Sequence, residues 1–384
     1  MSSIPAAAPE ERPLMPEYGG ACVASVVPAL LEVLNGNPAG VPSWLPEPVR
    51  EARQILLLVI DGVGWEYLGR ERASLPALGS GQGGPITSVV PTTTATCLTS
   101  IVTGTVPAGH GLVGYRMRIG AAGAGAGGVM NVLRWKVDGA DARVSLPPRE
   151  LQRAPAFGGL RIPALTRTEF TTTGFTAAHL GDSRLVTWRQ PSSLVVDALA
   201  FLRGGERFVY AYVDGPDSVA HQHGLGDHYA AELRYVDWLV GELAGGLPPG
   251  AALVVISDHG QVGVEAPSLL LPPEVMSLVQ LISGEARFRW LHARPGAEAD
   301  LVAVSQELFG EIAWVRSRRS VIDEGWFGGP LSTDVAARLG DVALVARDAA
   351  SFLDPSDTGE LRLRSRHGSL TPPEMLVPLL AWAG

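Results

Sequence analysis

Three short runs of the chain are continuously apolar and each ends at an aspartate. They cover residues 55–60 (ILLLVI), 208–213 (FVYAYV) and 252–256 (ALVVI). Five or six apolar residues in a row are typical of a strand that is buried on both faces of a parallel sheet. The runs lead into Asp61-Gly62, Asp214-Gly-Pro-Asp217 and Ser-Asp258-His259-Gly260. The pattern predicts an α/β protein with a mostly parallel central sheet and helices on both faces.

A fourth run has a different pattern. Residues 361–366 (LRLRSR) alternate between apolar and polar side chains, as in a half-exposed strand, and lead into His367-Gly368. Ligands of open α/β sheets bind beyond the carboxyl ends of the strands. We therefore expect the acidic and imidazole side chains that follow the three continuously apolar runs to gather at one edge of the sheet. One such aspartate alone is more often a helix cap, which is our interpretation of Asp214.

The rest of the chain gives weaker signals. Residues 22–34 have the pattern of a helix, although Pro28 lies inside it, and residues 1–20, rich in Pro, Ala and Glu, predict a flexible arm. Residues 21–384 are then expected to form a single domain that includes the insertion described below. The glycine- and alanine-rich stretch 120–128 predicts a surface loop or the tip of a hairpin. Residues 267–340 predict a small cap insertion, with strands at 286–292 and 312–315 and a helix at 299–309.

Charge and composition exclude several functions. The 384 residues carry a net charge of −9, which disfavours a nucleic-acid polymer as partner. Lys136, the single lysine, follows no glycine-rich phosphate loop, so a P-loop mechanism is excluded. Two cysteines are too few for a disulfide framework. Without a secretory signal or an apolar run of about 18 residues, we expect a cytoplasmic protein with no membrane association. The oligomeric state stays open.

The polar residues at the strand ends have the chemistry of a metal site. A two-zinc centre needs about six nitrogen and oxygen ligands. Asp217 and His221 are four residues apart, so that one helical turn places both on the same face. Carboxylates and imidazoles without a thiolate suit catalytic Zn²⁺ and also accept Mn²⁺ or Fe. We expect two divalent ions about 4 Å apart, held by residues from this set: Asp61, Asp217, His221, Asp258, His259 and His367.

A candidate nucleophile lies in the segment PTTTATC, residues 91–97. Its threonines come directly before a helical run that ends at Gly104. A hydroxyl at a helix N-terminus lies where backbone N–H groups and the helix dipole favour an anion. Capping the helix is the alternative role for each of these threonines, and a catalytic role needs a metal ion to lower the pKa of the hydroxyl.

Five ordered segments resemble the motifs of the alkaline phosphatase superfamily, and its nucleotide pyrophosphatase/phosphodiesterase branch most of all. They are LLLVIDGVG, SVVPTTTATCLTSIVTGTVPAGHGLVGYR, GPDSVAHQHG, ISDHGQ and SRHGSLTPPEMLVP, which lie between positions 55 and 379. The resemblance implies two zinc ions and a threonine nucleophile on an α/β core. It matches Asp61, Thr94, Asp258 and His259 to one zinc site and Asp217, His221 and His367 to the other. Cys97 stands where members of the branch often have an asparagine.

The resemblance implies hydrolysis of phosphodiesters or nucleotide phosphoanhydrides, with a small-molecule phosphoester as substrate and a covalent phospho-threonine intermediate. A phosphomonoesterase, a phosphonate hydrolase, a phosphomutase and a catalytically silent module that binds a phosphorylated ligand stay open as alternatives. No lysine or arginine lies within the Thr94 and Asp217 motifs. We therefore expect diesters to be cleaved about 10-fold faster than monoesters, unless Arg116 or Arg366 folds back into the site.

Overall fold

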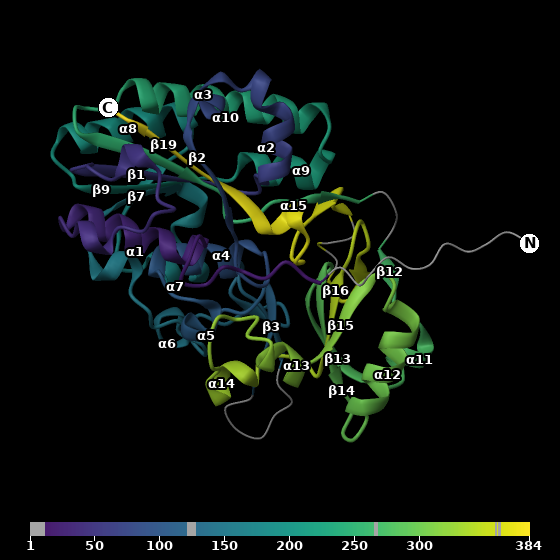
Figure 1. Ribbon diagram of the computed structural model, residues 1–384. Coiled ribbons are helices and arrows are strands. Elements are labelled where there is room, and N and C mark those ends of the chain that lie inside the picture. The colour runs from purple at the N-terminus through teal and green to yellow at the C-terminus, as the bar shows by residue number, and fades with distance from the viewer. Residues whose placement is uncertain (1–11, 121–127, 265–267, 358, 360–361) are drawn as a thin grey trace, which may run out of the picture.

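A computed structural model describes residues 12–120, 128–264, 268–357, 359 and 362–384. Within these residues a seven-stranded sheet forms the centre of the molecule (Figure 1), with strand order β2-β19-β10-β1-β9-β7-β8. Strand β19 runs antiparallel to both of its neighbours, β10 and β2, and all other neighbouring pairs of this sheet are parallel. The α/β fold predicted from the sequence is confirmed. The strand bounds are β1 Gln54–Ile60, β2 Gln82–Thr87, β7 Pro163–Arg167, β8 Arg184–Trp188, β9 Phe208–Val213, β10 Ala251–Ile256 and β19 Leu376–Ala383.

Strand β1 shows why its run is apolar throughout. Ile55, Leu57 and Val59 pack into the core on one face of the sheet. Leu56 and Leu58 pack into the core on the other face. Because successive side chains of a strand point to opposite faces, only a strand covered on both sides keeps every position apolar.

Helices cover both faces of this sheet (Figure 1). Helix α1 lies where a helix over residues 22–34 was predicted, and Pro28 is accommodated inside it. One face carries α1 Val23–Leu34, α4 Thr94–Thr103 and α7 Gly174–Leu180. The other carries α2 Trp65–Glu71, α3 Pro76–Ser80, α8 Pro191–Arg203, α9 Gly215–His223 and α10 Asp227–Gly245. None of the described helices is long and apolar enough to cross a membrane.

The insertion after β10 forms its own layer at the lower right of Figure 1. Its strands pair antiparallel in the order β13-β14-β16-β15, and α11 Pro273–Met276 and α12 Glu298–Phe309 pack on them. The predicted helix and both predicted strands have counterparts here. The fourth strand lies beyond residue 340, where the insertion was expected to end. The strands are β13 Val279–Glu285, β14 Phe288–Ala293, β15 Ala313–Ser317 and β16 Val342–Ala346.

Smaller elements surround the edge of the central sheet. A second four-stranded antiparallel sheet contains β3 Arg116–Ile119, β4 Gly128–Asn131, β5 Lys136–Val137 and β6 Ala140–Asp141. Two-stranded pairs join β11 Val262–Gly263 to β18 Ser365–Arg366 and β12 Leu269–Leu270 to β17 Phe352–Leu353. Of the described residues in the alternating run at 361–366, only Ser365 and Arg366 form a strand, β18. Residues 360–361 lie outside the described part. Short helices are α5 Pro107–His110, α6 Pro148–Leu151, α13 Arg318–Asp323, α14 Thr333–Ala336 and α15 Pro372–Met375.

The N-terminal segment differs from the predicted flexible arm where it is described. The Leu14 N–H donates to the Leu370 carbonyl at 3.0 Å, and the Tyr18 hydroxyl donates to the Trp326 carbonyl at 2.8 Å. Pro13 and Pro16 are buried. Residues 12–20 therefore pack on the body of the molecule, because their few apolar side chains find partners there. Residues 1–11 and most of the predicted loop at 120–128 lie outside the described residues.

Candidate metal centre and active site

The strand order brings three sequence motifs to one edge of the central sheet. Strands β10, β1 and β9 are adjacent and parallel, so their carboxyl ends lie side by side. Asp61 directly follows β1, and its N–H donates to the carbonyl of Val213 at the end of β9 at 2.9 Å. Helix α9, which carries Asp217, starts just beyond β9, and Asp258 follows β10. The predicted gathering of acidic and imidazole groups therefore results directly from the parallel pairing.

A first cluster consists of Asp61, Asp258 and His259, all buried. The His259 Nε2 atom lies 3.4 Å from Asp61 Oδ1 and 3.5 Å from Asp258 Oδ2. Among the described residues, those two carboxylate oxygens are buried without a hydrogen-bond partner. A buried acceptor without a donor is costly, and a bound cation removes that cost.

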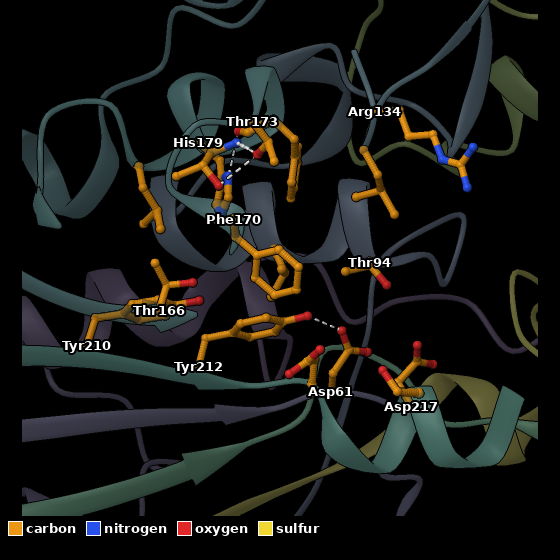
Figure 2. Close-up of a pocket in the computed structure, with 17 residues that line it drawn as sticks. Asp61, Thr94, Arg134, Thr166, Phe170, Thr173, His179, Tyr210, Tyr212 and Asp217 are labelled. Atoms are coloured by element: carbon orange, nitrogen blue, oxygen red, sulfur yellow. Dashed lines mark hydrogen bonds between the residues drawn. The ribbon is translucent and has the colours of Figure 1, made fainter. Parts of the chain in front are cut away.

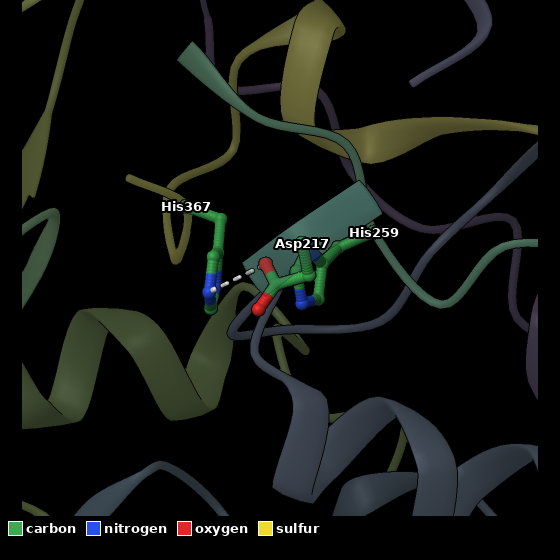
Figure 3. A group of neighbouring side chains, drawn as sticks. All are labelled: Asp217, His259 and His367. Carbon is green, nitrogen blue, oxygen red and sulfur yellow. Dashed lines mark ion pairs between the residues drawn. The ribbon is translucent and has the colours of Figure 1, made fainter. Parts of the chain in front are cut away.

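A second cluster consists of Asp217, His259 and His367 (Figure 3). The Asp217 Oδ1 atom lies 3.8 Å from Nε2 of His367 and 3.4 Å from Nε2 of His221. The rings of His259 and His367 stack with centroids 3.7 Å apart. The two clusters share His259 and so form one continuous site, and His221 adjoins it through Asp217.

The backbone fixes the orientation of all three imidazoles. Nδ1 of His367 lies 2.8 Å from the Thr92 carbonyl, Nδ1 of His221 lies 2.9 Å from the Ser365 carbonyl, and Nδ1 of His259 lies 3.1 Å from the Gly260 carbonyl. A carbonyl oxygen only accepts, so each Nδ1 carries the proton. Each Nε2 then presents a lone pair to the clusters, the arrangement that metal-binding histidines usually have.

The pKa shifts at the two clusters indicate that the buried carboxylates lack a nearby positive charge. Burial, followed by the nearby carboxylates Asp258 and Asp217, raises the pKa of Asp61 well above its ordinary value. Burial is also the main cause that raises the pKa of Asp258. Burial and the neighbouring imidazoles of His259 and His221 lower the pKa of His367 well below its ordinary value. The carboxylate oxygens and the imidazole Nε2 atoms that face one another can only accept hydrogen bonds, so none of them satisfies another. Each can donate an electron pair to a metal ion, and this set of ligands fits divalent cations.

Thr94 is the first residue of helix α4 and lies beside the first cluster. Its hydroxyl oxygen is 3.2 Å from Nε2 of His259. Thr93 takes the N-cap position, but its side chain makes no capping hydrogen bond. The hydroxyl of Thr92 donates to the Ser369 carbonyl at 2.7 Å. Of these three threonines, Thr94 is the one whose hydroxyl contacts an imidazole of the clusters.

Comparison with known proteins gives the family. The family described as "Type I phosphodiesterase / nucleotide pyrophosphatase" matches residues 55–370. The chain belongs to this family. Its fold is that of the alkaline phosphatase superfamily, as the resemblance implied. A comparison with curated protein sequences finds no match.

Solved structures share the fold at low sequence identity. Murine ectonucleotide pyrophosphatase/phosphodiesterase 5, an inactive variant in complex with AMP, is 15% identical with a TM-score of 0.60, over 86% of this chain and 88% of that chain. Phosphonoacetate hydrolase from Sinorhizobium meliloti 1021, in complex with phosphonoformate, is 17% identical with a TM-score of 0.61, over 86% of this chain and 90% of that chain. Both proteins therefore bind small phosphorus-containing ligands.

Two residues that the sequence motifs did not single out hold the carboxylates of this phosphodiesterase-family site. The Tyr212 hydroxyl donates to Oδ2 of Asp61, and Gln261 Nε2 donates to Oδ1 of Asp217 at 2.9 Å. Gln261 ends the ISDHGQ motif, so its place beside Asp258-His259 was a usable signal. Tyr212 lies inside an apolar strand, where nothing in the sequence separates it from the other core residues.

Asp214 and His110 do not belong to the metal clusters. Nη1 of Arg167 lies 3.0 Å from Oδ2 of Asp214, and the Asp214 side chain makes no capping hydrogen bond. Asp214 occupies the N-cap position of α9, as interpreted from the sequence, but its carboxylate serves an ion pair. His110 is buried and its Nε2 is 2.8 Å from the Ser100 hydroxyl, which agrees with a structural role.

Two cavities flank Thr94. The first, about 320 Å³, contains the aromatic side chains of Phe170, Phe175, Tyr210 and Tyr212, and we call it the aromatic cavity (Figure 2). The second, about 250 Å³, contains the side chains of His221, His367, Glu285 and Arg366, and we call it the polar cavity. Four residues line both cavities: Thr94, Leu133, Arg134 and Asp217. The remaining walls of the first are formed by Leu98, Phe170, Phe175, Leu180, Tyr210 and Tyr212, together with the polar residues Asp61, Thr166, Thr173, Thr176, His179, Asp214 and Ser218.

Of the two arginines named above as able to fold back into the site, Arg366 lies beside Thr94 and Arg116 does not. Arg366 and Arg134 both line the polar cavity with Thr94. Arg134 is 40 positions from Thr94 in the sequence, so a search within motifs does not find it. Arg116 makes ion pairs with Asp354 and Asp357. Cys97 is buried with its sulfur 3.2 Å from the Ser88 hydroxyl, and it lines neither cavity.

Proposed function

We propose that this protein hydrolyses phosphodiesters or nucleotide phosphoanhydrides through a covalent intermediate on Thr94. The observation that carries the proposal is the position of the Thr94 hydroxyl. It lies at the start of α4, 3.2 Å from His259, which is the residue that the two metal clusters share. A hydroxyl in this place is next to positive charge from bound ions and from the helix N-terminus.

Asp61, Asp258 and His259, with Thr94, would hold one divalent ion, and Asp217, His221 and His367 would hold the other. Zinc suits this set of oxygen and nitrogen donors. When bound, the ions supply Lewis-acid charge that lowers the pKa of the threonine hydroxyl and offsets the negative charge of the transition state.

Hydrolysis then proceeds in two displacement reactions at the phosphorus atom. The Thr94 oxygen attacks phosphorus, a new O–P bond forms, and the bond from phosphorus to the leaving oxygen breaks. The proton of the hydroxyl passes to solvent, and the leaving group departs as an alcohol or a phosphate. Water next cleaves the bond between Thr94 and phosphorus, which releases the phosphorylated product and restores the hydroxyl. The N–H groups at the start of α4 are placed to bind a phosphoryl oxygen.

The two cavities support a substrate with two arms. A phosphodiester or phosphoanhydride has a group on each side of phosphorus, and Thr94 lies on the wall of both cavities. A simple monoester has a group on one side of phosphorus only. It leaves one cavity empty and lacks the binding energy that a second group would gain there. Turnover of a chromogenic diester should therefore exceed turnover of the matching monoester by about 10-fold in kcat/KM, or ~1.4 kcal/mol. Equal or faster cleavage of the monoester would move the protein to the phosphomonoesterase alternative.

Phosphonate hydrolysis is a second candidate, and the two arginines favour it. The phosphonoacetate hydrolase with the same fold binds phosphonoacetate, a small ligand with a carboxylate beside the phosphonate. Arg134 and Arg366 give the polar cavity of this chain two guanidinium groups. Phosphate release from phosphonoacetate, measured beside diester cleavage, distinguishes the two functions.

A further inference from the structure

Arg134 is placed on the wall of both cavities by the turn between β4 and β5. Leu133 and Arg134 line the aromatic and the polar cavity alike. Figure 2 shows Arg134 on the same side of the aromatic cavity as Thr94, at the opposite end from Thr166 and Tyr210. Both cavities beside Thr94 are therefore also lined by Arg134.

The fold holds this turn in one place, although the Arg134 side chain itself is exposed. The next residue, Trp135, is fully buried, and its indole N–H donates to the Leu146 carbonyl at 2.8 Å. The Arg134 N–H donates to the side-chain oxygen of Asn131 at 3.0 Å. Nδ2 of Asn131 donates in turn to the Tyr115 hydroxyl at 2.7 Å. Arg134 is thus presented by an anchored turn, which reduces the entropy lost when it binds a ligand.

Among the residues that the structure describes, the guanidinium of Arg134 has no charge partner. None of the carboxylates in the described residues lies within ion-pair distance of its guanidinium, in contrast to Arg116, which pairs with Asp354 and Asp357. The acidic groups of the polar cavity are Asp217 and Glu285. Asp217 already contacts His221, His367 and Gln261. A guanidinium presented to a cavity without an internal partner is suited to an anionic ligand, which it can bind through two parallel hydrogen bonds.

We propose that Arg134 determines specificity by binding a second anionic group of the substrate, a carboxylate or a phosphate, carried on the arm that enters the polar cavity. The inference rests on the proposed function, because it places the reacting phosphorus at Thr94. It adds that the preferred substrate is charged at two positions, the reacting phosphoryl group and the end of one arm.

The test uses p-nitrophenyl phosphodiesters that differ only in the second arm: propyl, 2-carboxyethyl and 2-phosphoethyl. Arg134→Gln should lower kcat/KM for both charged arms by about 10- to 100-fold, mainly through KM, because a charged hydrogen bond is lost. The propyl ester should stay within 2-fold. Arg134→Lys should recover part of the loss. Arg143→Gln is the matched control, since Arg143 is exposed, follows β6 and lines neither cavity. A loss on the carboxylate arm only, or on the phosphate arm only, identifies which anion is bound.

An equal loss on all three esters would overturn the inference, since Arg134 would then contact the reacting phosphoryl group itself. No loss on any ester would overturn it as well. Calorimetry with the zinc-loaded protein separates this result from failure of the proposed function. Arg134→Gln should weaken 2-carboxyethyl phosphate about 10-fold and leave propyl phosphate unchanged, even if no ester turns over. Unchanged affinity for both would show that the inference is wrong independently of the reaction.

Discussion

At the scale of single residues, Thr94 differs from the threonines next to it by one contact. Its hydroxyl reaches Nε2 of His259, whereas Thr92 bonds to the backbone of Ser369 and Thr93 occupies the N-cap position. The proposed chemistry of the site therefore rests on one oxygen atom in a run of similar side chains.

Thr94→Ala should abolish turnover and leave the fold and the metal content intact. The variant removes the attacking oxygen, whereas loss of a threonine at a helix start costs only about 1 kcal/mol. Thr94→Ser should keep measurable activity because it keeps a hydroxyl. Steady-state kinetics and metal analysis of the purified variants check this. Thr93→Ala is the matched control, and an inactive Thr93→Ala beside an active Thr94→Ala would place the nucleophile one residue earlier.

Tyr212→Phe tests the support of the first metal cluster. The variant removes the hydroxyl that donates to Oδ2 of Asp61 and changes little else, because the ring stays in the core. Loss of a hydrogen bond to a metal-binding carboxylate typically weakens metal affinity by 10- to 100-fold. Zinc titration against a competing chelator measures this affinity. Tyr210→Phe is the control, since Tyr210 lies in the same strand and its hydroxyl makes no hydrogen bond within the described residues. Equal affinities for both variants would contradict a role for Tyr212.

At the scale of elements, the insertion after β10 is joined to the metal site by a buried ion pair. Arg287, in the turn between β13 and β14, makes two contacts of 2.8 Å with Glu374 on α15. Glu374 also accepts from the Ser369 N–H at 3.0 Å. Ser369 is two residues after His367. The small sheet thus helps to fix the loop that carries one of the metal-cluster histidines.

Glu374→Gln should therefore affect both stability and metal binding. Removing one partner leaves the buried guanidinium of Arg287 uncompensated, which costs about 3–5 kcal/mol of unfolding free energy. Zinc affinity should fall as well, because the His367 loop loses an anchor. Urea unfolding and zinc titration measure the two effects. Asp323→Asn, which breaks the exposed pair with Arg319, should change stability by less than about 1 kcal/mol. A stable Glu374→Gln protein with normal zinc affinity would exclude this coupling.

The elements that the sequence predicted are those whose pattern follows from local burial. Strands β1, β9 and β10 are buried on both faces, so their apolar runs and terminal aspartates were recognisable. The i, i+4 spacing of Asp217 and His221 likewise survives in α9. Contacts between distant segments leave no such pattern. Arg287 and Glu374 are 87 residues apart, and Arg134 is brought to Thr94 only by the fold of the β3–β6 sheet.

At the scale of the whole molecule, buried histidines couple stability to pH. Burial lowers the pKa of His110 to about 3, and it lowers the pKa of His179 and of His292 to about 4. The unfolded chain binds protons at these groups near pH 6.5 and the folded chain does not. Their stabilising effect is therefore complete above pH 6.5 and is lost as the pH falls from 6.5 toward the folded values. Each contributes a loss of about 1.4 kcal/mol per pH unit in that window.

His110→Gln isolates one of these contributions. The variant should be less stable than the wild type at pH 7, because the hydrogen bond with Ser100 is disturbed. Between pH 7 and pH 5, however, its unfolding free energy should fall by about 2 kcal/mol less than that of the wild type. Urea unfolding of both proteins with a chelator present gives the two differences. If the unfolding free energies of the two proteins had the same pH dependence, the pKa of His110 would not differ between the folded and the unfolded chain.

Capture of the covalent intermediate tests the central claim most directly. The zinc-loaded protein is mixed with a chromogenic phosphodiester, quenched in acid within one turnover, digested and analysed by mass spectrometry. The intermediate should add the phosphoryl group with its remaining arm to the peptide that contains Thr94, with fragmentation placing it on that residue. The adduct should be absent from Thr94→Ala. An adduct on another residue, or turnover by Thr94→Ala at the wild-type rate, would contradict Thr94 as the nucleophile.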